Sequence, residues 1–197
     1  MGAPMTNVPP VPPPWIGYSN PYALNNPTGL IDTYGLDTYG TTQEIQNSIV
    51  KTALGLVGST AWSDQVENGN YATGTNKCNK FVSDVLGWAN ASPGTPNGLF
   101  HKYPPTAGQW ADPSYNIPGW HIISPGTTTP QAGDIVAQQI PYSDASGHVM
   151  IVGPNGTVIG TGDGNTRQPH GTVEQIPIPK SLGPNPSGPL IYRRFGP

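Results

Sequence analysis

The single cysteine of the chain, Cys78, lies where the apolar periodicity predicts the start of a helix, and His148 opens an apolar run, 149–152, seventy residues later. A helix N-terminus has a partial positive charge and free N–H groups, which favour a thiolate, and Lys77 and Lys80 place further positive charge beside it. An imidazole can accept the thiol proton and return it to a leaving amine. The pair predicts a cysteine hydrolase with Cys78 as nucleophile and His148 as general base.

Each of these residues also has a structural interpretation. A free cysteine is commonly a small buried apolar residue, and a histidine at a strand end can be satisfied by backbone groups. The remaining histidines, His101, His121 and His170, lie in turn-rich segments without metal-ligand spacing and are expected to be solvated. One cysteine excludes an internal disulfide and a multi-thiolate zinc site, so the chain is predicted to use no metal or other cofactor.

A third group should orient the imidazole, and the hairpin signal Asn155-Gly156 suggests which residue supplies it. If these two residues form the whole turn, Pro154 pairs with Thr157, and His148 then faces Asp163 across the sheet. Asn165 is the second candidate. A bulge or a longer turn would shift the register by one residue and remove this direct pairing. The structural alternative for Asp163 is a solvated loop acid.

The chain divides into helices first and strands afterwards. Thr41 to Glu44 form a capping box, which predicts a helix ending near Gly55 or Gly58. A second amphipathic helix should run from Cys78 to the stop signal at 92–94. Strands are predicted at 134–137, 148–153, 157–161 and 190–195, which gives an α+β fold with an antiparallel sheet.

Composition and charge exclude several classes of protein. The net charge is −3 with eight basic residues, which predicts no nucleic-acid partner, and no apolar run is long enough to predict a membrane span. The 26 glycines and 25 prolines indicate a loop-rich fold. Residues 1–40, which are rich in proline and then in Tyr, Asn and Gly, are interpreted as a leader or linker without the pattern of a Sec signal peptide.

Three motifs together resemble a known family. Cys78 heading a helix, the run 132–136 (Ala-Gly-Asp-Ile-Val) and the run 147–153 (Gly-His-Val-Met-Ile-Val-Gly) resemble the NlpC/P60 and CHAP amidases, over about residues 70–165. These are papain-like cysteine peptidases that cut amide bonds in peptidoglycan. The resemblance implies a nucleophile helix packed on a small antiparallel sheet. It also implies a peptidoglycan stem peptide or cross-bridge as substrate.

The resemblance has departures and further implications. The Asp-Cys-Ser-Gly-Phe of the NlpC/P60 branch is Lys77-Cys78-Asn79-Lys80-Phe81 here, so the bond that is cut stays open. The family's orienting residue commonly lies about twelve positions after the histidine, which falls on Gly160 and cannot serve. The backbone N–H of Cys78, with a donor from the 71–77 loop, would form the oxyanion hole.

Several other polar and aromatic residues are assigned roles. Trp110, Trp120 and Asn165 are the predicted substrate-binding residues. Asp134 is interpreted as shaping a turn. Arg193 and Arg194 are interpreted as strand-flanking charges, with the binding of substrate carboxylates as the alternative.

The N-terminal segment resembles the end of an Rhs-repeat core, through Tyr22-Ala23-Leu24-Asn25-Asn26-Pro27 and the residues that follow. Such cores carry C-terminal toxin domains. The resemblance implies that 1–40 is a core remnant and 41–197 the cysteine hydrolase domain of an antibacterial effector. The protein would then stay in the cytoplasm until a non-Sec route exports it, would act in the periplasm or cell wall, and would require an immunity protein.

Two rival functions use the same residues differently. A deamidase or transglutaminase-like toxin would use Cys78 and His148 on a glutamine of a target protein. A catalytically inactive module would bind cell-wall glycopeptide on Trp110 and Trp120, and its Cys78 would have ordinary reactivity.

Overall fold

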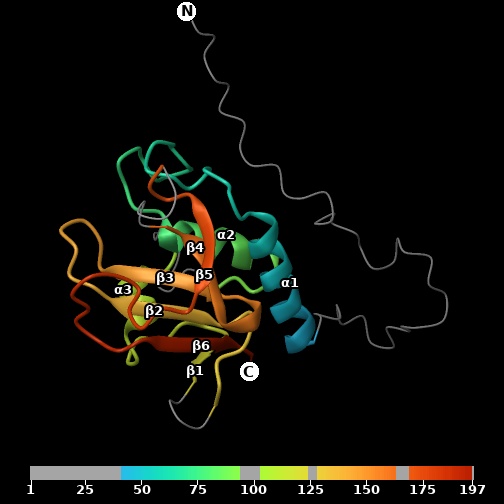
Figure 1. The fold of residues 1–197 in the computed structure, drawn as a ribbon. Helices are drawn as coiled ribbons and strands as arrows, with labels where there is room; N and C mark the ends of the chain where they lie inside the picture. Colours follow the sequence, from blue (N-terminus) through green and yellow to red (C-terminus); the bar gives the residue numbers. More distant parts are fainter. Residues whose placement is uncertain (1–40, 94–102, 124–127, 163–168, 197) are drawn as a thin grey trace, which may run out of the picture.

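The computed structural model describes residues 41–93, 103–123, 128–162 and 169–196. Within these ranges the helices and the single 3-10 turn are α1 (Thr42–Gly55), α2 (Cys78–Trp88), α3 (Ala107–Ala111) and η2 (Pro154–Gly156). The strands are β1 (Trp120–Ile122), β2 (Ile135–Gln139), β3 (Gly147–Val152), β4 (Thr157–Thr161), β5 (Val173–Pro177) and β6 (Ile191–Phe195). All strand pairs are antiparallel, in the order β1-β6-β2-β3-β4-β5 (Figure 1). The chain is therefore α+β with an antiparallel sheet, as predicted.

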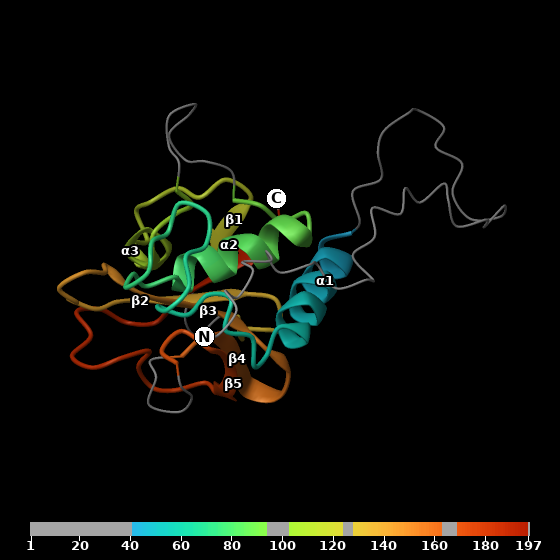
Figure 2. The same ribbon diagram turned by 90° about the horizontal axis from the view of Figure 1, so that it is seen from above.

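The two faces of the sheet are covered differently. The helices lie on one face of the central strands, where α2 contacts β3 and α3 contacts β2 (Figure 2). Buried residues of that face form the main core, in which Phe81 and Leu86 of α2 meet Val149 and Ile151 of β3. The opposite face forms a smaller core of Val136, Met150, Val152 and Val158, partly covered by Leu182 and by other apolar residues around it. Successive residues of β3 therefore alternate between the two cores.

Helix α1 begins at the predicted capping box. The hydroxyl of Thr41 accepts a hydrogen bond from the Glu44 N–H, and the Glu44 carboxylate accepts one from the Thr41 N–H at 2.7 Å. Together these bonds satisfy two N–H groups at the helix start. The predicted helix is confirmed, and it ends at Gly55, the first of its two expected stops.

Helix α2 also agrees with its sequence pattern. Its buried residues, at i, i+3, i+4, i+7 and i+8, are Cys78, Phe81, Val82, Val85 and Leu86. This spacing gives one continuous apolar face, which packs on β3. The helix begins at Cys78, and no side chain caps its N-terminus because the preceding residue is Lys77.

The four predicted strands are confirmed as β2, β3, β4 and β6 within one or two residues. The sequence patterns missed β1, β5 and the one-turn helix α3. Strand β1 has three residues, and β5 carries two glutamine or glutamate residues in five, so neither shows a strong apolar alternation.

The predicted hairpin register between β3 and β4 is wrong by one residue. Asn155 and Gly156 do lie in the turn, but the turn is the three-residue η2, with Asn155 in the left-handed region at φ 55°. The Gly153 N–H donates to the Thr157 carbonyl at 2.8 Å, and Ile151 pairs with Ile159. Continued toward His148, this register puts Gly162 opposite the histidine instead of Asp163.

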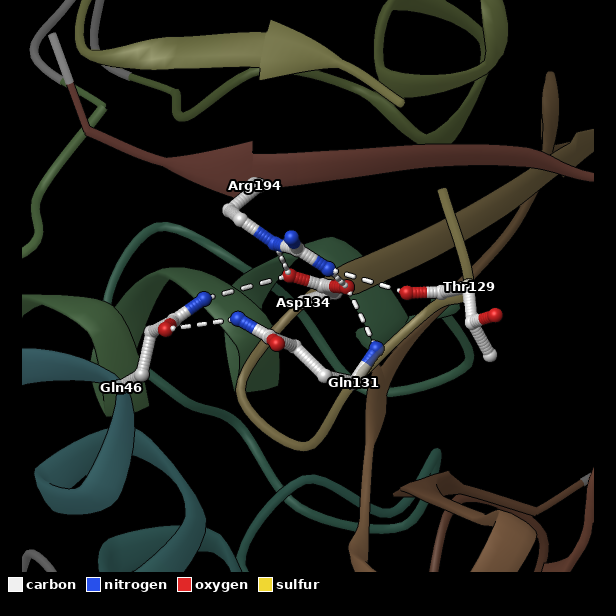
Figure 3. Close-up of polar contacts among 5 residues, drawn as sticks. All are labelled: Gln46, Thr129, Gln131, Asp134 and Arg194. Carbon is white, nitrogen blue, oxygen red and sulfur yellow. Dashed lines mark hydrogen bonds and ion pairs between the residues drawn. The ribbon is translucent and has the colours of Figure 1, made fainter. Parts of the chain in front are cut away.

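A buried carboxylate ties three separate segments together (Figure 3). Asp134, which is fully buried, accepts hydrogen bonds from Arg194 Nε at 2.9 Å and Nη2 at 2.8 Å, from the Gln131 N–H at 2.7 Å and from Gln46 Nε2 at 3.3 Å. The preceding Gly133 has φ 93°, and a Cβ there would meet the Gln46 backbone at 2.9 Å. The Gly133-Asp134 pair therefore has a structural role, and the interpretation of Asp134 as a turn-shaping residue agrees with this arrangement.

The part of the chain described by the structure contains no helix with the length and apolar character needed to cross a bilayer. Residues 1–40 lie outside the described ranges, so the predicted leader and its boundary at 41 stay predictions.

Replacing Asp134 with Asn should destabilise the fold by about 3 kcal/mol, because the guanidinium of Arg194 would lose its buried partner. The free energy of unfolding from chemical denaturation measures this. Glu67→Gln is the matched control, since Glu67 is exposed, and it should change stability by less than about 0.5 kcal/mol. Equal stability of the two variants would show that the Asp134 contacts are dispensable.

Candidate active site

The thiol of Cys78 lies at the contact between α2 and β3. Cys78 is the first residue of α2, and 6% of its surface is exposed. Its sulfur is hydrogen-bonded by the backbone N–H groups of Val149, Asn79 and Cys78 itself. Val149 follows His148 in the chain, so the sulfur lies beside the backbone of the residue next to the histidine.

The Val149 N–H reaches the sulfur because β3 and β4 stop pairing before this point. Their pairs are Ile151 with Ile159 and Val152 with Val158, and within the described parts of the two strands the pairing does not extend back to Val149. On its other side β3 stays paired with β2 down to Gly147. The thiol therefore occupies the place where a β4 carbonyl would otherwise accept the hydrogen bond.

The backbone at position 147 leaves room only for a glycine before His148. Its φ is 151°, and a Cβ at this position would collide with the Gln138 carbonyl oxygen of the neighbouring strand. A larger residue would push β3 away from β2 and would displace the histidine with it. The Gly-His pair is therefore a packing requirement that places the imidazole at the end of the sheet.

Burial is the largest influence on the pKa of the Cys78 thiol. Burial raises the pKa of the Cys78 thiol to about 11, and the three N–H hydrogen bonds only partly oppose this. The sequence predicted the reverse, a solvent-near thiol with a lowered pKa. The apolar neighbours of Cys78 in the main core are the physical reason for the difference.

The two neighbouring lysines do not supply the expected positive charge at the thiol. Lys80 forms an ion pair with Asp84 one turn along α2, at 2.5 Å. Lys77 is buried, and its ammonium group donates to the carbonyls of Ser63 and Thr75, each at 3.1 Å. Burial lowers the pKa of Lys77, and the Asp64 carboxylate opposes that shift.

A cavity of about 500 Å³ brings the predicted nucleophile and base together. Cys78 and His148 both line it, although seventy residues separate them in the chain. We call it the charged cavity, because its lining includes Asp64, Lys77, Asp144, His148 and His170. One Asp64 carboxylate oxygen, Oδ1, is buried without a hydrogen-bond partner.

A second cavity, of about 470 Å³, opens on the other side of Cys78. We call it the tyrosine cavity. Its walls include Asn70, Tyr71, Asn79, Tyr103 and Thr106. The two tyrosine rings meet edge to face with centroids 5.4 Å apart, and Asn79 Nδ2 donates to the Tyr71 hydroxyl at 2.9 Å. His148 is absent from the lining of this cavity.

The two cavities adjoin at Cys78. The residues that line both are Thr75, Asn76, Cys78, Asp144, Ala145 and Gly147. Asn76 Nδ2 donates to Asp144 Oδ2 at 2.9 Å, which links the loop before α2 to the loop between β2 and β3. This hydrogen bond therefore spans the cleft beside Cys78.

The remaining predicted site residues have different positions. Asp163 and Asn165 lie outside the described residues, so their roles stay predictions. Trp110 and Trp120 belong to the main core, 1% and 4% exposed, and their rings meet edge to face at 5.2 Å. Because both rings are buried, neither offers a face to a substrate. The prediction that Trp110 and Trp120 bind substrate is therefore wrong.

Arg193 and Arg194 are structural. Arg193 is buried and donates to the backbone carbonyls of Trp110, Asp112 and Tyr115. Arg194 is the partner of Asp134 (Figure 3). The interpretation as ordinary strand-flanking charges omitted these contacts, and no guanidinium of this pair faces either cavity.

Most of the residues that line the two cavities were not predicted from the sequence. Asp64, Tyr71 and Lys77 come from the loop before α2, His170 from the segment before β5, and Tyr103 from the segment before α3. His170 was expected to be solvated, whereas it is partly buried beside the charged cavity. None of these residues has a regular spacing to Cys78 in the sequence, so only the fold reveals that they converge. In the described ranges no three His, Cys, Asp or Glu side chains cluster as they would around a metal ion.

No protein-family model matches this chain, and a search of curated proteins also finds no match.

Alkylation of Cys78 by iodoacetamide should increase about tenfold for each pH unit from 7 to 10 and level off only near pH 11. The reason is that the thiolate reacts, and burial holds its fraction low at neutral pH. Mass spectrometry gives the alkylation rate at each pH. The unfolded protein is the control, because its cysteine should have an ordinary pKa of about 8.5. A plateau at or below pH 8 in the folded protein would contradict the buried thiol.

Removing the hydrogen bond between Asn76 and Asp144 should speed the alkylation of Cys78, because this bond spans the cleft beside the thiol. Asp144→Ala and Asn76→Ala should each raise the rate severalfold at constant pH. The double variant should be no faster than the faster single variant, since both changes break the same contact. Rates equal to that of the unchanged protein would show that the bond does not restrict access.

Proposed function

We propose that the chain is a cysteine amidase or endopeptidase that cleaves amide bonds of peptidoglycan. One observation carries the proposal: Cys78 at the N-terminus of α2 and His148 on β3 line a single cavity, and the Val149 N–H holds the sulfur beside the histidine's strand. A thiol and an imidazole in one cleft are the minimum set for nucleophilic acyl transfer. The resemblance of the motifs to NlpC/P60 and CHAP amidases supplies the substrate class.

The chemistry would start from a neutral thiol, because burial raises the Cys78 pKa. His148 accepts the thiol proton as the sulfur attacks the amide carbonyl carbon, and a C–S bond forms. The tetrahedral intermediate then breaks its C–N bond, and the imidazolium returns the proton to the departing amine. Water, deprotonated by His148, attacks the resulting thioester, and the carboxylic acid leaves while Cys78 regains a proton.

The negative oxygen of the intermediate would lie at the N-terminus of α2. The Cys78 N–H belongs to the first turn of this helix, where no side chain caps the free N–H groups. The predicted second donor from the 71–77 loop has a candidate in the amide of Asn76, since this residue lines the cleft on both sides of Cys78. Release of its hydrogen bond to Asp144 would let the amide turn toward the intermediate.

Asp163 remains the first candidate for orienting the imidazole, and Asn165 the second. If the β3–β4 register is continued past its last pair, Gly162 is the position level with His148, so Asp163 would act from the next position along the chain.

The structure bears differently on the two rival functions, the cell-wall-binding module and the deamidase or transglutaminase-like toxin. A cell-wall-binding module was predicted to use Trp110 and Trp120, and the burial of both rings removes that surface. A deamidase or transglutaminase-like toxin would use the same two cavities with a protein glutamine, so it differs from the proposed amidase in substrate alone.

The biological setting rests on the proposed activity and on the resemblance of 1–40 to an Rhs core. An exported antibacterial toxin would be held in the cytoplasm, away from its substrate, and released by a non-Sec route. An immunity protein would protect the producing cell, and its expected contact is the cleft around Cys78.

Digestion of purified peptidoglycan, with fragments identified by mass spectrometry, tests the proposal. The unchanged protein should release fragments, and Cys78→Ala should release none above background. His148→Ala should slow release at least about a hundredfold, since the imidazole moves the proton in each step.

His121→Ala is the matched control, because His121 is exposed on β1 and away from both cavities, and it should keep full activity. Equal activity of Cys78→Ala and the unchanged protein would rule out the thiol mechanism. Activity on a glutamine-containing protein with none on peptidoglycan would favour the deamidase.

A further inference from the structure

A segment between β5 and β6 lies on the face of the sheet opposite to α2 (Figure 2). We call residues 181–188 the strap. Leu182 of the strap packs against the smaller core, and both Leu182 and Pro184 line the charged cavity together with His148. The strap is therefore a wall of the cavity that holds the predicted base.

Gln138 of β2 fastens the strap to the sheet. Its side chain is buried, and its amide makes three hydrogen bonds to the strap. Oε1 accepts from the Ser181 hydroxyl at 2.9 Å and from the Leu182 N–H at 2.8 Å. Nε2 donates to the Gly188 carbonyl at 2.8 Å. One side chain thus joins both ends of the strap to β2.

The glutamine that fastens the strap is also the neighbour of the histidine. Gln138 and His148 are directly opposite each other in the β2–β3 register. Side chains of such a pair lie on the same face of the sheet, with Cβ atoms about 5 Å apart. Their places in the strands match those of Val136 and Met150, which belong to the smaller core. The strap therefore covers the face from which the imidazole leaves β3.

The predicted nucleophile approaches from the other side. Cys78 belongs to the main core, which the helices cover, and its sulfur meets the Val149 N–H where β3 and β4 stop pairing. The χ1 angle of a histidine has three staggered wells. An imidazole that leaves β3 on the strap side reaches the thiol only in a well that turns the ring toward this edge of β3. A group that fills the strap side removes wells that point away from the thiol.

We propose that Gln138 is a positioning residue for His148: by fastening the strap, it closes the space beside the imidazole and keeps the ring turned toward Cys78. This inference rests on the proposed function and deepens it, because it names a residue that acts through the base. Gln138 lines neither cavity, so a substrate in the cleft does not touch it.

The strap has further contacts that hold it near the sheet. The Ser187 N–H donates to the Gln139 carbonyl at 3.0 Å. A Cβ at Gly183 would collide with the hydroxyl of Tyr142, so the strap lies directly against another residue of the cavity wall. Replacement of Gln138 should therefore loosen the strap without detaching it from the sheet.

Gln138→Met tests the proposal, because methionine has a similar length and makes none of the three hydrogen bonds. On a peptidoglycan fragment that the unchanged protein cleaves, kcat should fall about three- to tenfold. The lower figure is the loss of a preference for one χ1 well among three, and the higher figure adds displacement of the ring. KM should stay within about twofold, because Gln138 does not contact the substrate.

Two further variants separate positioning from general damage. Gln139→Met is the matched control, since Gln139 is the adjacent glutamine and is exposed, and it should leave kcat and KM unchanged. Ser181→Ala removes only one of the three bonds and should lower kcat by a smaller factor than Gln138→Met does. A rise in KM at constant kcat for Gln138→Met would show that the strap acts as a wall for the substrate and would overturn the positioning role.

A second measurement does not depend on catalysis. Diethyl pyrocarbonate modifies neutral imidazoles, and peptide mass spectrometry gives the rate at each histidine. Gln138→Met should raise the rate at His148 severalfold, because the strap no longer closes on the ring, and should leave the rate at the exposed His121 unchanged. Gln139→Met should change neither rate.

An unchanged rate at His148 in Gln138→Met, with the far-UV circular dichroism of the unchanged protein, would overturn the positioning role. Absence of any Cys78-dependent cleavage by the unchanged protein would instead overturn the proposed function. The rate at His148 would then still decide whether Gln138 holds the strap against the imidazole.

Discussion

The contact between the start of α2 and the end of β3 is the interaction on which the site depends. The apolar face of α2 packs on β3, and this packing carries Cys78 to the Val149 N–H at the point where β3 and β4 cease to pair. Gly147 allows β3 to lie close to β2 there, and the next residue is His148. Buried packing along one helix face thus brings Cys78 and His148 to the lining of one cavity.

The same packing gives the cleft its chemical asymmetry. Loops from several parts of the chain converge around the helix N-terminus, and they place Asp64, Lys77 and His170 on the histidine side and Tyr71 and Tyr103 on the other. Because burial raises the pKa of the Cys78 thiol, the proposed reaction would need proton transfer from the thiol to the imidazole of His148 when substrate is bound. The hydrogen bond between Asn76 and Asp144 spans the cleft where the substrate would have to cross.

The sequence predicts the parts of this structure that depend on local patterns. The capping box at Thr41 is a specific local motif, and α2 and the four predicted strands have clear apolar patterns. Each of these elements is found where it is expected. The hairpin register was wrong because Asn-Gly is compatible with turns of different length, and one extra turn residue shifts every partner.

Other features could not be read from the sequence because they depend on tertiary contacts. Trp110 and Trp120 lie in turn-rich segments and look like exposed anchors, yet the core encloses both. Lys77 is buried with its ammonium group bonded to the carbonyls of Ser63 and Thr75, and the pKa of Cys78 is raised because the thiol is buried in the main core. His170 and Asp64 join the charged cavity across long separations, which no spacing rule records.

The most direct test of the central claim is to trap the covalent intermediate. Protein mixed with solubilised peptidoglycan fragments and quenched with acid should show, by intact-mass and peptide mass spectrometry, an acyl adduct on Cys78 that hydroxylamine removes. The account predicts this thioester in the unchanged protein and its absence in Cys78→Ala. Fragment release without any adduct on Cys78, or release by Cys78→Ala, would contradict it.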